Sequence, residues 1–545
     1  MLGRVAVCLN RFFVCAVVCL AWSVPGHAAW HEAQSDHFVI YADDSAKDIQ
    51  HFAEDLERYH QAMVLLTGRE IAKPSPSNRV TIYVVGSGRQ IRKLVGDKNS
   101  NIAGFYVPRA GGSVAFVQDI RFRSGDVHFS TVVLLHEYAH HFLISSSRYA
   151  MPRWLSEGAA EFFAAASFPK DGGVSVGRPA VHRAGDLLYS EEVPIRELFD
   201  DELYWENRRR KYDSYYGRSW LLYHYLTFSK ERQGQLSDYW VKTATGTESL
   251  EAAREVFGDL DELEKELDRY LKQRRMYHFP IPAEAISIGA VSVRELSDGH
   301  AKVMPLLLRS KRGVTREEAE ELVPDFRKVA AKFPKDPAVL AALSEAEYDS
   351  GNLDAAITAA DKAIALDPSQ KNAYVQKGYA LFAKAEDTTD LDQEEAAFKA
   401  AMTPFSQLNK LENDHPLPLI YYYRSYAQRG VEPPENAKHA LERASELAPF
   451  DHSLALNVAT MLAAEGKIGL AQLGLGPVAA NPHGGGMAEF AQAMLDQLAE
   501  APEGEPFIPS FSDEEASDKE GASAATDDDA GTGDTAQAPA EDEDA

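Results

Sequence analysis

The residues whose types and spacing best predict chemistry are His136, Glu137 and His140, within the run His-Glu-Tyr-Ala-His at 136–140. On a helix, the two histidines project from one face a single turn apart, so both imidazoles can reach one metal ion. Glu137 lies about 100° around that helix from His136, where it can take a proton from a metal-bound water without being a ligand. Zn²⁺ suits this arrangement because it lowers the pKa of bound water and polarises a carbonyl. The pattern predicts hydrolysis at a zinc site.

A pair of glutamates follows shortly after this run, in Trp154-Leu155-Ser156-Glu157-Gly158-Ala159-Ala160-Glu161. Glu157 and Glu161 are four residues apart, so a helix places them on one face. One carboxylate facing the zinc completes a His-His-Glu set with an open fourth position. The other can accept the free N–H of a ligating histidine and fix its tautomer. The alternative is two solvated charges on an amphipathic helix, but the mostly apolar neighbours leave little polar face.

Two helices are expected to position these side chains. Ser130 or Thr131 can cap a first helix that runs through Ile144, and Pro152 opens a second helix over about 153–166. Strands and further helices are expected around this pair. The strands are 37–41, 80–85 and 111–117, and the helices are 46–66, 215–229 and 250–275.

With Pro152, Trp154 and Leu155 included, the two motifs resemble the gluzincin metallopeptidases, and especially their bacterial peptidase-MA-like members. The resemblance covers roughly residues 30–275 and is specific only at the two motifs. It implies peptide-bond hydrolysis by a zinc-activated water. The roles it implies are zinc ligation by His136, His140 and Glu157, general base catalysis by Glu137, and support of a ligating histidine by Glu161.

The resemblance also implies a tyrosine that stabilises the tetrahedral oxyanion. Gluzincins often place it in a Tyr-x-Lys-Gly setting, and Tyr216-Gly217-Arg218-Ser219 is similar but replaces both Lys and Gly. Tyr215 is the nearest rival, and a buried core tyrosine is the other interpretation of Tyr216. In related enzymes an upstream strand pairs with the extended substrate. Residues 113–117 either do this by β-augmentation or form a simple core strand.

Beyond a Pro-containing connector at 276–304, the chain becomes Ala-rich and helical. From about 305 to 498 it resembles tetratricopeptide (TPR) repeats, in which small residues lie where paired helices touch. The positions that carry this resemblance are Leu343, Gly351, Ala356, Ala363 and Pro368, then Gly378, then Ala437, Ala444 and Pro449, then Val458, Gly466 and Ala471. A plain helical bundle is the alternative. Repeat arrays form concave surfaces, so we expect these helices to bind a protein partner.

Length and composition limit the number of domains and the class of partner. The 545 residues predict two or three domains, and the net charge of −27 argues against a nucleic acid as the main partner. Much of this charge lies in the last 35 residues, where the chain lacks the apolar side chains needed for a core. We therefore expect disorder in this acidic tail. No later segment is long and apolar enough to span a membrane.

The N-terminus is typical of a secretory signal. Arg4 and Arg11 supply positive charge, an apolar run follows at 12–24, and Gly26-His27-Ala28 predicts cleavage before Ala29. An uncleaved anchor is the alternative, although the run falls short of the roughly 20 apolar residues that a span needs. All 3 cysteines (Cys8, Cys15, Cys19) lie in this segment, so the mature chain has none. Export without disulfides favours a bacterial periplasm or exterior.

Together these observations predict an α+β zincin-like catalytic domain followed by an all-α helical-repeat (TPR-like) domain. The expected organisation is a signal peptide (1–28), a gluzincin-like metallopeptidase domain (29–275), a connector (276–304), TPR-like repeats (305–498) and a disordered acidic tail (499–545). The expected function is an exported zinc metallopeptidase acting on a peptide or protein. One alternative is a periplasmic TPR scaffold whose zinc domain is inactive or structural, although an intact general base is unexpected in a dead site. Another is hydrolysis of a non-peptide amide.

Overall fold

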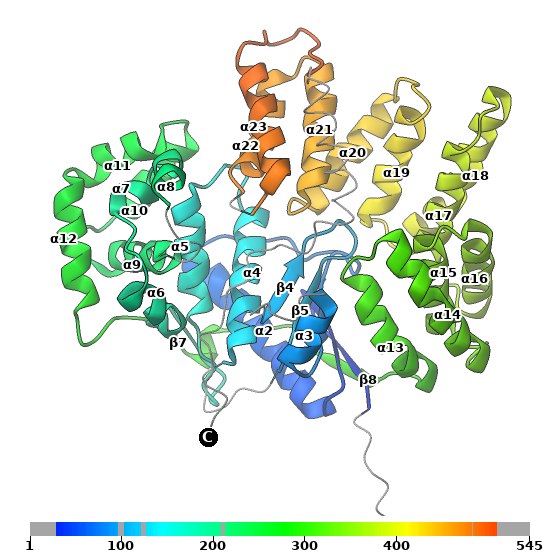
Figure 1. Ribbon diagram of the computed structural model, residues 1–545, viewed down its shortest axis with the longest axis horizontal. Helices are drawn as coiled ribbons and strands as arrows, with labels where there is room; N and C mark the ends of the chain where they lie inside the picture. Colours follow the sequence, from blue (N-terminus) through cyan, green and yellow to red (C-terminus); the bar gives the residue numbers. More distant parts are fainter. Residues whose placement is uncertain (1–28, 96–102, 121–126, 209–212, 482, 510–545) are drawn as a thin grey trace, which may run out of the picture.

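A computed structural model describes residues 29–95, 103–120, 127–208, 213–481 and 483–509. The expected signal peptide and the chain beyond 509 lie outside the described residues. The described chain forms a mixed α/β region followed by a long array of helices (Figure 1). The fold class predicted from the sequence is confirmed. The boundaries at 275 and 305 stay predictions.

A six-stranded mixed sheet forms the centre of the α/β region. In spatial order its strands are β4 (Gly104–Val107), β5 (Val114–Val117), β3 (Val80–Val84), β2 (Phe38–Ala42), β1 (His31–Gln34) and β8 (Ser292–Glu295). Strands β5, β3 and β2 run parallel, whereas β4, β1 and β8 each pair with their neighbours antiparallel. A smaller ribbon joins β6 (Val174–Val176) to β7 (Phe279–Ile281). The segment expected as a connector thus supplies β7 and β8.

The two faces of the sheet bury different sets of helices. Because side chains alternate along a strand, Val80, Ile82 and Val84 of β3 pack in the core that contains α2 (Ala46–Thr67) and α4 (Phe129–Ser145). Tyr83 points the other way, into a core formed with α13 (Asp298–Lys311), α14 (Arg316–Lys332) and α15 (Pro337–Asp349). The first helices of the array therefore share a hydrophobic core with the sheet.

Helices α4 and α5 (Arg153–Ala164) carry the two sequence motifs. The N-cap of α4 is His128, whose side chain accepts a hydrogen bond from the Ser130 N–H. The expectation of Ser130 or Thr131 at this position is wrong, because the helix begins at Phe129. Helix α5 crosses α9 (Tyr215–Phe228) closely. A Cβ at Gly158 would lie 2.5 Å from the Ser219 carbonyl oxygen, so this crossing requires glycine.

Further helices surround this pair on the side away from the array (Figure 1). They are α6 (Ala184–Tyr189), α7 (Ile195–Leu198), α8 (Asp201–Asn207), α10 (Gln235–Ala244), α11 (Ser249–Phe257) and α12 (Leu260–Leu271). Helix α3 (Gly88–Val95) lies instead beside the sheet, in the core that α13–α15 share with it. The helix expected over 250–275 is two helices. Gly258, at φ 78°, ends α11, and Asp259 caps α12.

The helical array consists of antiparallel pairs, as TPR repeats do. After α13–α15 it continues through α16 (Leu353–Leu366), α17 (Lys371–Glu386), α18 (Leu391–Leu411), α19 (Pro416–Ala427), α20 (Glu435–Leu447), α21 (His452–Ala464), α22 (Ile468–Ala479) and α23 (Gly485–Ala499). Gly351 and Gly466 make the turns inside two pairs, each at φ 75°. Ala356 and Ala363 are fully buried where α16 meets its neighbours. The array curves away from the sheet and returns, so that α22 and α23 lie over α4 (Figure 1).

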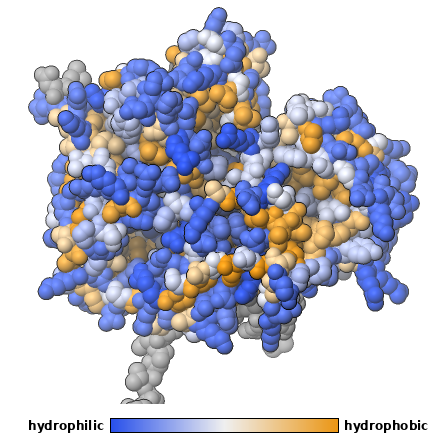
Figure 2. Space-filling model, turned by 180° about the vertical axis from the view of Figure 1, so that it is seen from behind, coloured by the Kyte–Doolittle hydropathy of each residue, from blue (hydrophilic) through white to orange (hydrophobic). Residues whose placement is uncertain are grey.

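The surface seen from behind is mostly hydrophilic, with hydrophobic side chains gathered in patches across its middle (Figure 2). Among the described residues, none of the helices has the length and apolar character needed to cross a membrane. Many hydrophobic residues of the described chain are buried in the two cores at the sheet and in further cores between the helices of the array.

A buried neutral histidine makes the stability of the α/β region depend on pH. His224 of α9 is fully buried, with its Nδ1 2.8 Å from the Tyr270 hydroxyl and its Nε2 3.0 Å from the Gly177 carbonyl oxygen. Burial lowers the pKa of His224 from 6.5 to about 4. Above pH 6.5 the ring is neutral in both states, whereas between 6.5 and about 4 only the unfolded chain takes up the proton. This histidine therefore lowers the free energy of unfolding by about 1.4 kcal/mol per pH unit in that window.

When the pH is lowered from about 7 to about 5, we predict that the free energy of unfolding falls by about 2 kcal/mol less in the His224→Gln variant than in the parent. Glutamine keeps a donor and an acceptor at this site but does not titrate. The measurement is denaturant unfolding followed by tryptophan fluorescence, because all six tryptophans precede the helical array. The same pH dependence in both proteins would contradict the prediction.

Candidate metal centre

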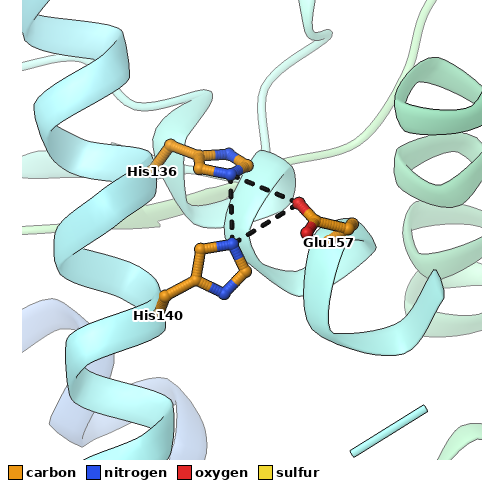
Figure 3. A group of neighbouring side chains, drawn as sticks. All are labelled: His136, His140 and Glu157. Atoms are coloured by element: carbon orange, nitrogen blue, oxygen red, sulfur yellow. Dashed lines mark hydrogen bonds and ion pairs between the residues drawn. The ribbon is translucent and has the colours of Figure 1, made fainter. Parts of the chain in front are cut away.

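Three buried side chains from α4 and α5 converge on one point (Figure 3). The Nε2 atoms of His136 and His140 are 3.1 Å apart. The Oε2 atom of Glu157 lies 3.3 Å from the first and 3.4 Å from the second. The structure therefore brings together the two histidines of the first motif and the first glutamate of the second.

These separations fit a tetrahedral metal ion. With metal–ligand distances of about 2.0–2.1 Å, two ligand atoms of a tetrahedron lie about 3.3–3.4 Å apart. The three observed separations span 3.1–3.4 Å. Two imidazole nitrogens and one carboxylate oxygen can thus hold a metal ion, and this donor set suits zinc.

The buried carboxylate of Glu157 supports the same interpretation. Its side chain is 0% exposed, and both of its oxygens lack a hydrogen-bond donor among the described residues. Burial alone would raise its pKa, but the imidazoles of His140 and His483 outweigh burial and hold the pKa of Glu157 well below its usual value. The carboxylate is therefore ionised, and a cation at the convergence point would neutralise it.

The two glutamates of α5 change the pKa of His136. Burial alone would lower its pKa, but the nearby carboxylates of Glu157 and Glu161 outweigh burial and raise the pKa of His136 well above its usual value. A metal ion must displace a proton from this ring. Metal affinity at this site therefore falls as the pH falls.

Glu161 lies behind His136, as expected of a supporting carboxylate. Its Oε1 is 3.2 Å from His136 Nδ1, so this contact directs His136 Nε2 toward the metal position. Two neighbouring side chains hold Glu161 in turn: His182 Nε2 lies 2.5 Å from Oε2, and Arg183 Nε donates to Oε1 at 2.8 Å. These charges outweigh burial and keep the pKa of Glu161 well below its usual value.

The second ligating histidine has its own partner. Ser156 Oγ lies 3.2 Å from His140 Nδ1. His141, the next residue, faces the sheet, where its Nδ1 lies 2.8 Å from the Tyr106 hydroxyl of β4 and its ring lies 4.5 Å from that of Phe450. His141 therefore joins α4 to the sheet and to the helical array, away from the metal position.

A large cavity opens at the metal position. It has a volume of about 2260 Å³ and lies between the α/β region and the inner face of the helical array. Its lining includes Glu137 and His140 of α4 together with Tyr379 and Tyr421 of the array. Glu137 is only partly buried and faces this space, as a general base must.

The structure separates the two candidate tyrosines. The ring centroid of Tyr216 lies 6.5 Å from that of His136, and the guanidinium of Arg183 lies 4.8 Å from the Tyr216 ring. Tyr215 is fully buried on another side, where its hydroxyl lies 3.4 Å from Asp201 and the Arg153 guanidinium covers its ring. Tyr216 is therefore beside the metal position, and its role stays a prediction.

Another group of acidic residues, Glu192, Glu264 and Asp268, has a different explanation. All three surround the guanidinium of Arg218, which is only 3% exposed. A buried guanidinium requires such partners, so these carboxylates neutralise Arg218.

The strand expected to pair with a substrate lies inside the sheet. Strand β5 pairs with β3 on one side and with β4 on the other, so it has no free edge. The core-strand interpretation is correct for it. Strand β4 is the edge strand next to β5, and its Tyr106 and Val107 line the cavity.

Sequence reasoning missed three residues of the centre, which are His182, Arg183 and His483. The adjacent His182 and Arg183 lie in no recognisable motif, and only the need of Glu161 for partners could have suggested them. His483 lies in the connection between α22 and α23, directly before a run of three glycines at 484–486. Its Nε2 lies 3.0 Å from Glu157 Oε1.

No family model matches the chain, and no curated protein matches it. Among solved structures, the chain is similar to a thermophilic TPR protein of Thermus thermophilus, at 13% identity, covering 37% of this chain and 98% of that one, with a TM-score of 0.31. It is also similar to YrrB, described as a TPR protein with an unusual peptide-binding site. The identity is 20%, the match covers 32% of this chain and 84% of that one, and the TM-score is 0.25. Yeast Tom70 matches at 13% identity over 70% of this chain and 66% of that one, with a TM-score of 0.26. The assignment of the metal centre therefore rests on its geometry.

We predict that the His136→Ala variant purifies without the metal that the parent retains. Removing one of three ligands leaves Glu157 and His140 unable to complete the site, so affinity falls by several orders of magnitude. The measurement is metal content by atomic emission after dialysis. The control is His51→Ala, which removes an exposed histidine of α2. Equal metal content in the three proteins would refute the ligand set.

Proposed function

We propose that this chain is an exported zinc metallopeptidase. The single observation that carries the proposal is the convergence of His136, His140 and Glu157 beside a general base that faces a large cavity. The resemblance of the two motifs to gluzincins supports zinc as the metal. Export is proposed from the signal-like residues 1–28.

In this proposal each group has a separate task. His136, His140 and Glu157 would hold zinc, which when bound would supply a water of lowered pKa and a Lewis acid for the scissile carbonyl. Glu137 removes a proton from the attacking water and delivers it to the leaving amine. The hydroxyl of Tyr216 donates to the oxyanion as charge develops on it. Glu161 keeps His136 oriented during these steps.

The size and lining of the cavity support a polypeptide substrate. Pockets for small molecules commonly have volumes of about 300–1,000 Å³, and this cavity has about 2260 Å³. The edge strand β4 can pair with an extended chain by β-augmentation, which leaves the substrate carbonyl near Glu137. The inner face of the helical array forms the opposite wall and can bind the rest of the polypeptide.

We predict that Glu137→Gln retains zinc but loses peptide hydrolysis by a factor of about 10²–10⁴, because glutamine cannot accept the proton. The measurement is cleavage of a mixed peptide library, with products identified by mass spectrometry, alongside metal analysis. Glu202→Gln is the control, since this exposed residue of α8 makes the same change away from the cavity. Retained turnover in Glu137→Gln would refute the mechanism.

The same experiment tests the scaffold alternative. Its supporting observation is the inner face of the helical array, which lines most of the cavity and can hold a protein partner without chemistry. A parent protein that binds zinc yet cleaves no peptide at any pH would favour a structural zinc site in a scaffold. Cleavage that Glu137→Gln abolishes favours the peptidase.

A further inference from the structure

The connection between α22 and α23 brings a side chain of the helical array to the metal centre. His483 is a partly buried residue of this connection, and its Nε2 lies 3.0 Å from Glu157 Oε1. Its ring centroid is 5.9 Å from that of His140. The array therefore contacts a metal ligand directly, although the two residues are far apart in the sequence.

The two oxygens of Glu157 face different partners. Oε2 lies within 3.4 Å of both ligating Nε2 atoms, so it is the oxygen that points to the metal position. Oε1 lies 3.0 Å from His483 Nε2, and among the described residues neither of these two atoms has a hydrogen-bond partner of normal geometry. Carboxylates that bind metals through one oxygen are usually held by a hydrogen bond to the other.

We propose that His483 is a positioning residue, which turns its Nε2–H, 3.0 Å from Glu157 Oε1, onto this oxygen and holds the carboxylate as a one-oxygen metal ligand. The proposal rests on the metal centre of the proposed function. It extends that centre beyond the α/β region, since the helical array completes the environment of the metal. His483 does not itself belong to the group of converging ligand atoms.

Local contacts fix the position of His483. Its backbone N–H donates to Asn481 Oδ1 at 3.2 Å, and Asn481 Nδ2 lies 3.0 Å from His452 Nδ1 at the start of α21. Gly484 follows, where a Cβ would lie 2.7 Å from the Ala488 Cβ, so a side chain does not fit there. Asn481 and His483 are thereby held at the start of α21.

Longer-range contacts fix this part of the array on the α/β region. The Ala110 N–H donates to Asp451 Oδ2 at 2.9 Å, and Asn78 Nδ2 donates to the Leu447 carbonyl oxygen at 3.0 Å. Glu412 accepts from Ser77 through both its oxygens, at 2.9 Å each. These contacts lie on the sheet side of the cavity, so the array is anchored there while His483 reaches the metal centre.

The test compares zinc affinity in the full chain for the parent and for His483→Ala, His483→Gln and His439→Ala. Zinc is titrated against a chromophoric chelator of known affinity. We expect His483→Ala to bind zinc about 10–100-fold more weakly, the usual effect of removing a group that holds a ligand. Glutamine restores an N–H donor at similar reach, so His483→Gln should recover most of the affinity. His439 is an exposed histidine of α20, and its alanine variant should match the parent.

A second readout follows the geometry of the site. With cobalt(II) in place of zinc, the visible absorption spectrum reports ligand arrangement, and we expect it to change in His483→Ala but not in His439→Ala. Unchanged zinc affinity in His483→Ala, or no recovery in His483→Gln, would overturn the role of His483. A parent protein that binds no zinc would instead remove the metal centre and with it the proposed function.

Discussion

The buried carboxylate of Glu157 imposes the constraint on which the rest of the centre depends. An ionised carboxylate removed from water costs on the order of several kcal/mol unless charges or donors compensate it. Glu157 is compensated by imidazoles from α4 and from the α22–α23 connection, and a metal ion held at the convergence point would compensate it further. The compensating groups lie on elements that are distant in the sequence. The polar centre is therefore complete only when the α/β region and the helical array have packed together.

The packing of the array explains how it can reach the centre at all. Helices α13–α15 cover one face of the central sheet, and the sheet separates them from α4 on the other face. The array then curves around the edge of the sheet near β4 and ends over α4 (Figure 1). Its inner face and the sheet edge enclose the cavity between them. The helical array is thus a wall of the site, and its curvature sets the dimensions of the space that a substrate enters.

The sequence predicted the parts of the centre that depend on local spacing. His136 with His140, and Glu157 with Glu161, are each four residues apart, so helix geometry alone places each pair on one face. The contact of Glu161 with His136 follows from the same periodicity. His182, Arg183 and His483 depend on tertiary packing, which no local pattern records. The position of β5 was also beyond prediction, because interior and edge strands that are buried on both faces share the same hydrophobic composition.

For the proposed peptidase, polypeptide-binding helices in the wall of the cavity would be an advantage. Binding energy from parts of a substrate that do not react can hold the scissile bond against Glu137 and thereby raise the rate of the chemical step. His483 would add a physical link between such binding and the metal position, because it lies on the same array as the surface that would hold the substrate. A polypeptide can alter the metal centre only if it binds better to one position of the α22–α23 connection than to another. That differential binding, transmitted through one hydrogen bond to Glu157, would make metal affinity depend on occupancy of the cavity.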